Sequence, residues 1–148
     1  MMIEPVKKEI ASFIVKGFSV RTKNQDEMNP KTAKLPALWQ QFFASELANT
    51  TSIFGVYSDY ESNEDGFYTV TAGVSRETNN DNLNAVTVLS GPYLVFEAKG
   101  PMPETVINVW KSIWEFFAAN RQFQRKFASD FELYSGSEHI AVHIGVFS

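Results

Sequence analysis

The run SIFGVYSDYESNEDGFYTVTAGV, residues 52–74, predicts a β-hairpin. Two short segments rich in β-branched and aromatic residues flank the dipeptide Asp65-Gly66, as is typical of antiparallel strands joined by a tight turn. A second hairpin is predicted near the C-terminus, where DFELY (130–134) and HIAVHIGVF (139–147) flank a short Gly- and Ser-rich segment. Each half of the chain therefore contains one predicted hairpin.

An amphipathic helix is predicted before the first hairpin, because apolar residues recur at helical spacing. They are Leu35, Leu38, Trp39, Phe42, Phe43 and Leu47. Asn29-Pro30 suits a helix start, with Asn as the cap and Pro at the first helical position. Pro36 would be costly inside a helix, so a regular helix that begins only there is also compatible with the sequence.

A second amphipathic helix is predicted between Pro103 and Asn120, or to one turn beyond Asn120. Pro is well tolerated at a helix start, and the apolar positions again follow helical spacing. These positions are Val106, Ile107, Trp110, Ile113, Trp114, Phe117 and Ala118. The second helix, like the first, precedes a hairpin.

The elements repeat in the same order, β-α-β-β, in each half of the chain. Residues 10–20 form the predicted strand of the first half, and segment 85–100 holds strand signals on both sides of Gly91-Pro92. Phe54–Ser58 also matches Phe131–Ser135 in sequence. We therefore predict one α+β domain over residues 1–148: a tandem repeat with pseudo-twofold symmetry, a mostly antiparallel sheet and two long helices.

The two halves are predicted to span about residues 8–76 and 84–147. Their superposition is expected to place Trp39 and the Trp-bearing face of the second helix at equivalent positions. A cleft at the pseudo-twofold axis is the natural place for a ligand.

Composition excludes several classes of protein. The 148 residues are 44% hydrophobic, which is too apolar for a disordered chain. The absence of cysteine excludes a disulfide scaffold, a Cys-based zinc site and a thiol nucleophile. A net charge of −4 argues against extensive nucleic-acid binding. Aromatic residues make up 14% of the chain, and such rings fill cores and line ligand cavities.

The N-terminal stretch MMIEPVKKEIASFIVKG has no apolar run of the kind found in secretory signals. No segment approaches 18 consecutive apolar residues, so no membrane span is predicted. A cytoplasmic location is therefore expected.

Motifs spread along nearly the whole chain resemble the gyrase inhibitor-like family. That family includes the effector-binding domains of bacterial AraC-type and MerR-type multidrug-responsive transcription regulators. The residues that carry the resemblance are Leu38-Trp39, Phe42, Gly55-Val56-Tyr57, Asp59-Tyr60, Tyr68, Ala72-Gly73, Gly91-Pro92-Tyr93, Val95-Phe96, Trp110, Ile113-Trp114, Phe131-Glu132-Leu133-Tyr134 and Ile140 through Val146. The resemblance implies a pocket that binds lipophilic cations between aromatic rings and a buried glutamate. The sequence leaves no room for a helix-turn-helix region, so a stand-alone form is expected.

Glu132 is the first candidate for the ligand site. Side chains alternate along a strand, so Glu132 and Tyr134 share one face, about 7 Å apart. A buried carboxylate is costly unless it is paired, and a cationic ligand is one possible partner. Alternation alone favours an exposed outer face for Glu132, and the resemblance reverses that balance in favour of the ligand role. Glu97 is a similar strand carboxylate without a family motif, and an edge or exposed position is predicted for it.

The other predicted ligand-binding residues are aromatic. The resemblance implicates Tyr68, for which core packing is the alternative. Trp39 and Trp110 lie on the apolar faces of their helices, where core packing is again the alternative. Tyr134 follows Glu132 by alternation, and the Gly91-Pro92-Tyr93 motif adds Tyr93.

No catalytic residue, metal site or cofactor is predicted. The sequence lacks a Gly-rich phosphate loop, a GxSxG elbow and a cluster of metal ligands. His139 and His143 have a spacing that suits zinc on a helix, but the segment alternates as a strand. Residues four apart on a strand lie about 13 Å apart, so a surface or interface role is predicted for these histidines.

The sequence therefore favours a protein that binds a small organic molecule, cationic or planar, over an enzyme. Two alternatives remain open. A buried glutamate with a raised pKa would also suit a hydrolase of reactive electrophiles, as some members of the resembled family are. A large apolar patch outside the cleft would favour a gyrase inhibitor-like module that binds gyrase or a separate regulator.

Overall fold

The computed structural model describes residues 3–76, 78 and 82–147. In chain order, the elements are β1 (Val6–Ile10), β2 (Phe13–Thr22), α1 (Asn24–Glu27), α2 (Leu35–Phe43), the short 3-10 helix η1 (Glu46–Ala48), β3 (Ser52–Ser58), β4 (Tyr68–Val74), β5 (Asn84–Val88), β6 (Gly91–Lys99), α3 (Glu104–Ala119), β7 (Arg125–Ser135) and β8 (His139–Val146). No helix among these residues is long and apolar enough to span a membrane.

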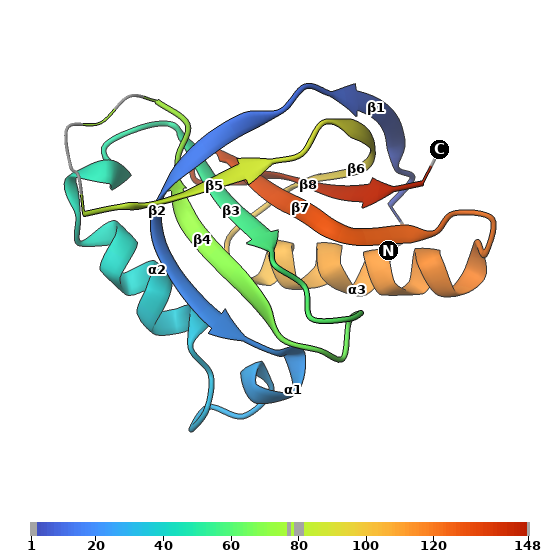
Figure 1. The fold of residues 1–148 in the computed structure, drawn as a ribbon, viewed down its shortest axis with the longest axis horizontal. Coiled ribbons are helices and arrows are strands. Elements are labelled where there is room, and N and C mark those ends of the chain that lie inside the picture. The colour runs from blue at the N-terminus through green and yellow to red at the C-terminus, as the bar shows by residue number, and fades with distance from the viewer. Residues whose placement is uncertain (1–2, 77, 79–81, 148) are drawn as a thin grey trace.

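One sheet contains all eight of these strands, in the order β1-β6-β8-β7-β3-β4-β2-β5 (Figure 1). All neighbouring strands are antiparallel. The equivalent strands of the two halves are β1 and β5, β2 and β6, β3 and β7, and β4 and β8. When each strand is exchanged with its equivalent, the strand order is the same read from the other edge of the sheet. A pseudo-twofold axis therefore lies between β3 and β7. The predicted α+β fold with a repeated unit and an antiparallel sheet is confirmed, and in each unit a further strand, β1 or β5, precedes the β-α-β-β elements.

The outermost strands are exchanged between the two units. β1 precedes β2 in the chain but pairs with β6, and β5 precedes β6 but pairs with β2. Each unit therefore completes the sheet of the other, which stabilises them as one domain.

The axis passes through one pair of residues in the middle of the sheet. The sequence match between Phe54–Ser58 and Phe131–Ser135 aligns Gly55 with Glu132. The same two residues are register partners in the β3–β7 pair. Gly55 and Glu132 occupy equivalent positions in the two units and are also paired with each other across β3 and β7. The pseudo-twofold axis must therefore pass between them, which places Glu132 at the centre of the molecule.

Both longer helices pack on the same face of the sheet (Figure 1). α2 covers β4 in a core that includes Leu38 and Phe42, and α3 covers β6 and β8 in a core that includes Ile113. On the opposite face, a third core joins β3 and β7 through Phe54 and Phe131. The helix-bearing face therefore has two separate cores, one under each helix.

The first helix is shorter than the sequence predicted. α2 has nine residues and begins at Leu35, and Leu47 lies on η1 instead. Pro36 occupies the first turn, where no intrahelical N–H donor is needed. The Glu27 carboxylate accepts the exposed N–H groups of Lys34 and Leu35 at 2.9 and 3.1 Å, an acidic contact that also suits the helix dipole. Of the two predicted helices, only α3, with 16 residues, is long.

Candidate functional site

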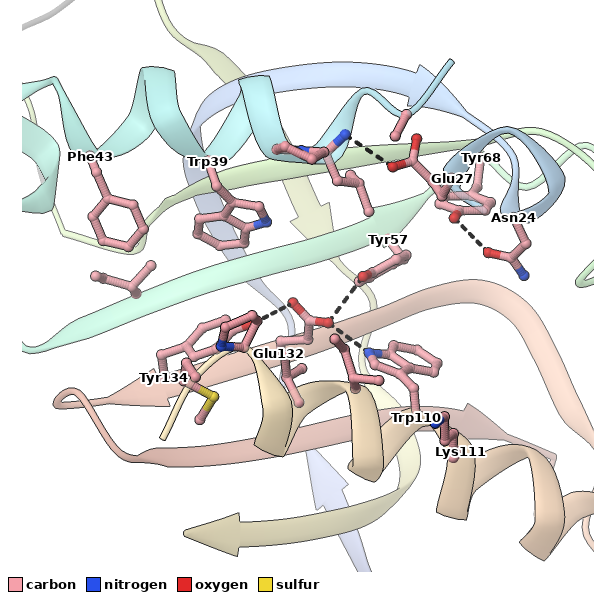
Figure 2. A pocket seen from close by; sticks show the side chains of 18 of the residues that line it. Asn24, Glu27, Trp39, Phe43, Tyr57, Tyr68, Trp110, Lys111, Glu132 and Tyr134 are labelled. Atoms are coloured by element: carbon pink, nitrogen blue, oxygen red, sulfur yellow. Dashed lines mark hydrogen bonds between the residues drawn. The ribbon is translucent and has the colours of Figure 1, made fainter. Parts of the chain in front are cut away.

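A cavity of about 1080 Å³ lies between α2 and α3, above the central strands β3 and β7 (Figure 2). Its charged lining residues are Glu27, Glu64, Lys111, Arg125 and Glu132. Most of the remaining wall is aromatic or aliphatic. Four of the lining residues are large, exposed apolar side chains, namely Met28, Phe43, Ile107 and Trp114. Apolar surface thus remains accessible around the cavity.

Glu132 lines this cavity from β7 and is only 3% exposed. Its Oε2 accepts hydrogen bonds from Trp110 Nε1 at 2.7 Å and from the Tyr57 hydroxyl at 3.0 Å. Its Oε1 accepts one from the Tyr134 hydroxyl at 3.1 Å. All three donors are neutral. Among the residues that the structure describes, no Lys, Arg or His side chain forms an ion pair with Glu132.

Burial raises the pKa of Glu132, and the hydrogen bonds from Trp110, Tyr57 and Tyr134 partly oppose that increase. Burial also raises the pKa of Tyr57 and Tyr134 well above the ordinary value for tyrosine, with Glu132 adding to both shifts. Both tyrosines are therefore protonated donors at neutral pH.

The aromatic rings around Glu132 come in two equivalent pairs. The Trp110 ring lies 5.3 Å from that of Tyr57, and the Trp39 ring lies 5.6 Å from that of Tyr134. In each pair, the tryptophan comes from the helix of one unit and the tyrosine from the other unit. The predicted equivalence of Trp39 and the Trp-bearing face of α3 agrees with these contacts.

Gly55 leaves room for the carboxylate. A Cβ atom at this position would lie 2.7 Å from Glu132 Oε1 and 3.1 Å from Trp39 Cζ2. Both distances are shorter than normal contacts. Any residue with a side chain would therefore displace Glu132 or Trp39.

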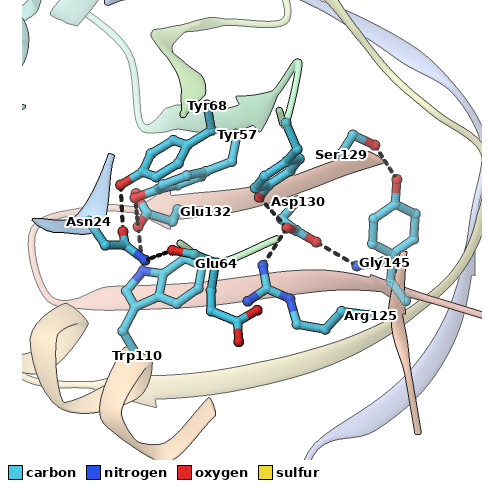
Figure 3. A network of polar contacts seen from close by, with 12 residues as sticks. Asn24, Tyr57, Glu64, Tyr68, Trp110, Arg125, Ser129, Asp130, Glu132 and Gly145 are labelled. Carbon is cyan, nitrogen blue, oxygen red and sulfur yellow. Dashed lines mark hydrogen bonds and ion pairs between the residues drawn. The ribbon is translucent and has the colours of Figure 1, made fainter. Parts of the chain in front are cut away.

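Tyr68 connects the floor of the cavity to two loops. Its hydroxyl donates a hydrogen bond to Asn24 Oδ1 at 2.6 Å, and Asn24 Nδ2 donates to the Glu64 carbonyl at 2.9 Å (Figure 3). Burial raises the pKa of Tyr68, so its hydroxyl remains a donor. These contacts hold α1 and the β3–β4 loop beside the cavity.

A second buried carboxylate, Asp130, lies two residues from Glu132 and is fully buried. Arg125 Nη2 contacts it at 2.8 Å, the Gly145 N–H donates to it at 2.8 Å, and the Tyr60 hydroxyl donates a short hydrogen bond (Figure 3). Burial acts to lower the pKa of Arg125, but Asp130 and other partners more than offset this and raise it. Among the described residues, Asp130 therefore has a cationic partner and Glu132 has none.

Comparison with known proteins identifies the family. The Cass2 sequence profile, described as integron-associated effector binding protein, matches residues 8–146. The chain belongs to the Cass2 family. An integron cassette protein from the mobile metagenome of Vibrio cholerae has a similar structure, with a TM-score of 0.89. Its sequence identity is 35%, and the match covers 97% of this chain and 95% of that protein.

Two further proteins are similar to this chain. The proposed transcriptional regulator YobU of Bacillus subtilis (strain 168) is 32% identical over 129 residues, which cover 80% of this chain and 78% of YobU. SAV2435, solved bound to tetraphenylphosphonium, shares the fold with a TM-score of 0.73 and 19% identity, over 99% of this chain and 95% of that protein. This Cass2 protein therefore belongs to a family of effector-binding proteins and is similar in sequence to YobU, a proposed transcriptional regulator.

The structure brings five of the six predicted ligand-site residues together in the Cass2 cavity. They are Glu132, Tyr68, Trp39, Trp110 and Tyr134. The sixth, Tyr93, does not line the cavity. It lies in the core on the opposite face of the sheet, where its ring packs 5.7 Å from Phe131 and its hydroxyl contacts Ser129 Oγ at 2.9 Å. Its strand presents the alternate residues, Leu94 and Phe96, to α3.

The two histidines lie on β8, the predicted strand, in different surroundings. His139 contacts the Glu97 carboxylate, and Glu97 is exposed as predicted. His143 is buried and stacks on Phe131 at 4.1 Å, so the prediction of a surface or interface role was wrong for this residue. Burial lowers the pKa of His143 to about 4. Within the described residues, no three His, Cys, Asp or Glu side chains are grouped as a metal site.

Sequence reasoning missed one partner of the central glutamate, Tyr57, and the second buried carboxylate, Asp130. Tyr57 was not predicted as a site residue, although the repeat match aligns it with Tyr134. Gly55 was noted only as part of a family motif. Asp130 shares the face of Glu132 by strand alternation, but its partner Arg125 lies beyond a register shift in β7, which no sequence pattern indicates.

Proposed function

We propose that this Cass2 protein binds an amphipathic or planar organic cation between α2 and α3, with Glu132 supplying the opposite charge. The supporting observation is the contrast between the two buried carboxylates. Asp130 is paired with Arg125, whereas the donors to Glu132 in the part of the chain that the structure describes are all neutral. A buried carboxylate without a cation is costly, and a cationic ligand would remove that cost.

The cavity walls suit such a ligand. Cations are attracted to aromatic faces by about 0.5–2 kcal/mol per ring, depending on desolvation. The rings nearest Glu132 are those of Tyr57, Trp110, Tyr134 and Trp39. Ligand pockets for drug-sized molecules have volumes of about 300–1000 Å³, and the volume of this cavity, about 1080 Å³, is slightly above that range. The tetraphenylphosphonium complex of SAV2435, which shares the fold, supports the same ligand class.

Glu132→Gln tests this function, because Gln keeps the size of the side chain and removes its charge. Tetraphenylphosphonium and tetraphenylborate carry the same four phenyl groups with opposite charges, so they serve as matched probes. We expect the variant to bind tetraphenylphosphonium at least tenfold more weakly, which corresponds to about 1.4 kcal/mol. Its affinity for tetraphenylborate should stay the same or increase. Tryptophan fluorescence and calorimetry measure both affinities.

Glu97→Gln is the matched control, because Glu97 is an exposed strand carboxylate outside the cavity. It should bind both probes as the unmodified protein does. Equal weakening of both probes by Glu132→Gln, or no change in either, would exclude Glu132 from the ligand site. Retained binding with loss of turnover of a reactive electrophile would instead identify the cavity as a hydrolase site.

A further inference from the structure

The two oxygens of Glu132 differ in how many hydrogen bonds they accept. An ionised carboxylate offers about four acceptor positions, two on each oxygen. Both positions of Oε2 are occupied, by Trp110 Nε1 and the Tyr57 hydroxyl. On Oε1, only the Tyr134 hydroxyl donates. Among the described residues, one acceptor position of the carboxylate therefore remains unused, and it belongs to Oε1.

The unused position lies on the α2 side of the carboxylate. Oε1 is the oxygen next to the bare backbone of Gly55 and to Trp39. In Figure 2, Oε1 is directed toward Tyr134 and the Trp39 side, and Oε2 toward Tyr57 and Trp110. The unused acceptor position of the carboxylate thus lies on the α2 side.

We infer that the ligand carries its charge on a protonated amine, which donates an N–H hydrogen bond to Glu132 Oε1 beside Trp39 and Tyr134. This inference rests on the proposed function and narrows the ligand class. A quaternary cation gains only charge attraction and ring contacts at this position. A protonated amine gains the same attraction and fills the one unused acceptor position.

Three fluorescent probes separate the hydrogen bond from charge and from size. They are the N,N-dimethyl and N,N-diethyl derivatives of 1-pyrenylmethylamine, both protonated at pH 7, and the N,N,N-trimethyl ammonium compound. The dimethyl and trimethyl probes differ by one methyl group in place of the N–H. The diethyl probe is bulkier and keeps the N–H. We expect the dimethyl and diethyl probes to bind about tenfold more tightly than the trimethyl probe.

Two tyrosine variants locate the hydrogen bond on one oxygen. Tyr134→Phe removes the one donor to Oε1 that the described residues supply, so the preference for dimethyl over trimethyl probe should increase severalfold. Tyr57→Phe removes a donor to Oε2 and keeps the ring. Because Tyr57 belongs to the binding site, its affinities for all probes can change, and only its preference between the dimethyl and trimethyl probes is compared. Its preference should stay within about twofold of that of the unmodified protein.

The outcomes separate this inference from the proposed function. Equal binding of dimethyl and trimethyl probes, both weakened by Glu132→Gln, overturns the amine preference and leaves the cation site in place. A diethyl probe as weak as the trimethyl probe also overturns it, because size would then explain the loss. If Glu132→Gln weakens none of the probes, the cation site and the amine preference are both wrong.

Discussion

Gly55→Ala tests whether the space beside the carboxylate is needed for binding. The new Cβ would lie 2.7 Å from Glu132 Oε1 and 3.1 Å from Trp39 Cζ2. Both neighbouring atoms belong to side-chain ends, so the backbone of β3 is not forced to move. The carboxylate is held on its other oxygen by Trp110 at 2.7 Å and Tyr57 at 3.0 Å. Oε1 must therefore move, and its hydrogen bond to Tyr134, already 3.1 Å long, is expected to break.

The expected cost follows from these contacts. Overpacking a filled interior costs about 1–3 kcal/mol, and replacing Gly by Ala within an element recovers about 0.5–1 kcal/mol. The free energy of unfolding should therefore fall by about 1 kcal/mol. Displacing the carboxylate should weaken tetraphenylphosphonium binding about tenfold, since the ion pair depends on its position.

Urea unfolding and fluorescence titration with tetraphenylphosphonium measure the two effects. Gly145→Ala is the control, because its Cβ would lie 2.9 Å from the Ser129 carbonyl oxygen, a backbone atom, and not beside Glu132. This variant should be destabilised at least as much as Gly55→Ala and keep its affinity for the cation. If Gly55→Ala binds the cation normally, or if both variants lose affinity in proportion to stability, the reasoning about this space is wrong.

Three further predictions concern stability. Burial raises the pKa of Glu132, so the folded state binds more protons than the unfolded state. The free energy of unfolding therefore falls as pH rises through the raised pKa. In urea unfolding, Glu132→Gln should be more stable than the unmodified protein at pH 8 and lose that advantage below about pH 4. The pKa of about 4 for His143 makes stability fall as pH decreases, because His143 in the unfolded chain takes up a proton below about pH 6.5 and His143 in the folded protein does not. In the Glu132→Gln background, His143→Phe should therefore remove an acid-induced loss of stability of roughly 3 kcal/mol between pH 6.5 and 4, measured by unfolding at each pH. Arg125→Met leaves the fully buried Asp130 without its cation, and should lower the free energy of unfolding by about 3–5 kcal/mol in calorimetry; an unchanged stability would contradict the ion pair.

Local patterns in the sequence were sufficient to predict most elements of the fold. Turn residues and alternation predicted both hairpins, and helical spacing together with the position of Pro103 predicted α3. Those signals act over a few residues, where backbone preference dominates. The length of α2 was harder to predict, because Leu47 continues the helical spacing while Ser45 caps the separate turn η1. The exchange of β1 and β5 between units depends on contacts distant in sequence, and no local pattern indicates it.

The same limit applies to the site. Alternation places Glu132 and Tyr134 on one face of a strand and does not say which face meets the helices. The family resemblance supplied that choice for Glu132 correctly. For Tyr93, motif membership was a poor guide, because its side chain packs on the opposite face. His143 looked polar and surface-exposed in the sequence, yet a neutral imidazole stacked on Phe131 is well suited to a core.

The pseudo-twofold axis explains why the central carboxylate is single. A repeat with identical units would place the same residue at positions 55 and 132, which face each other as register partners. Two glutamates there would repel one another, and one would remain protonated. Two glycines would leave no charge in the cavity. The pair Gly55 and Glu132 resolves both problems, because the glycine of one unit provides the space that the glutamate of the other unit occupies. The equivalent tyrosines, Tyr57 and Tyr134, then donate to the same carboxylate from opposite sides. The symmetry of the fold thus places equivalent aromatic residues on both sides of the cavity. The two units differ at the pair Gly55 and Glu132, and this difference gives the cavity a single carboxylate.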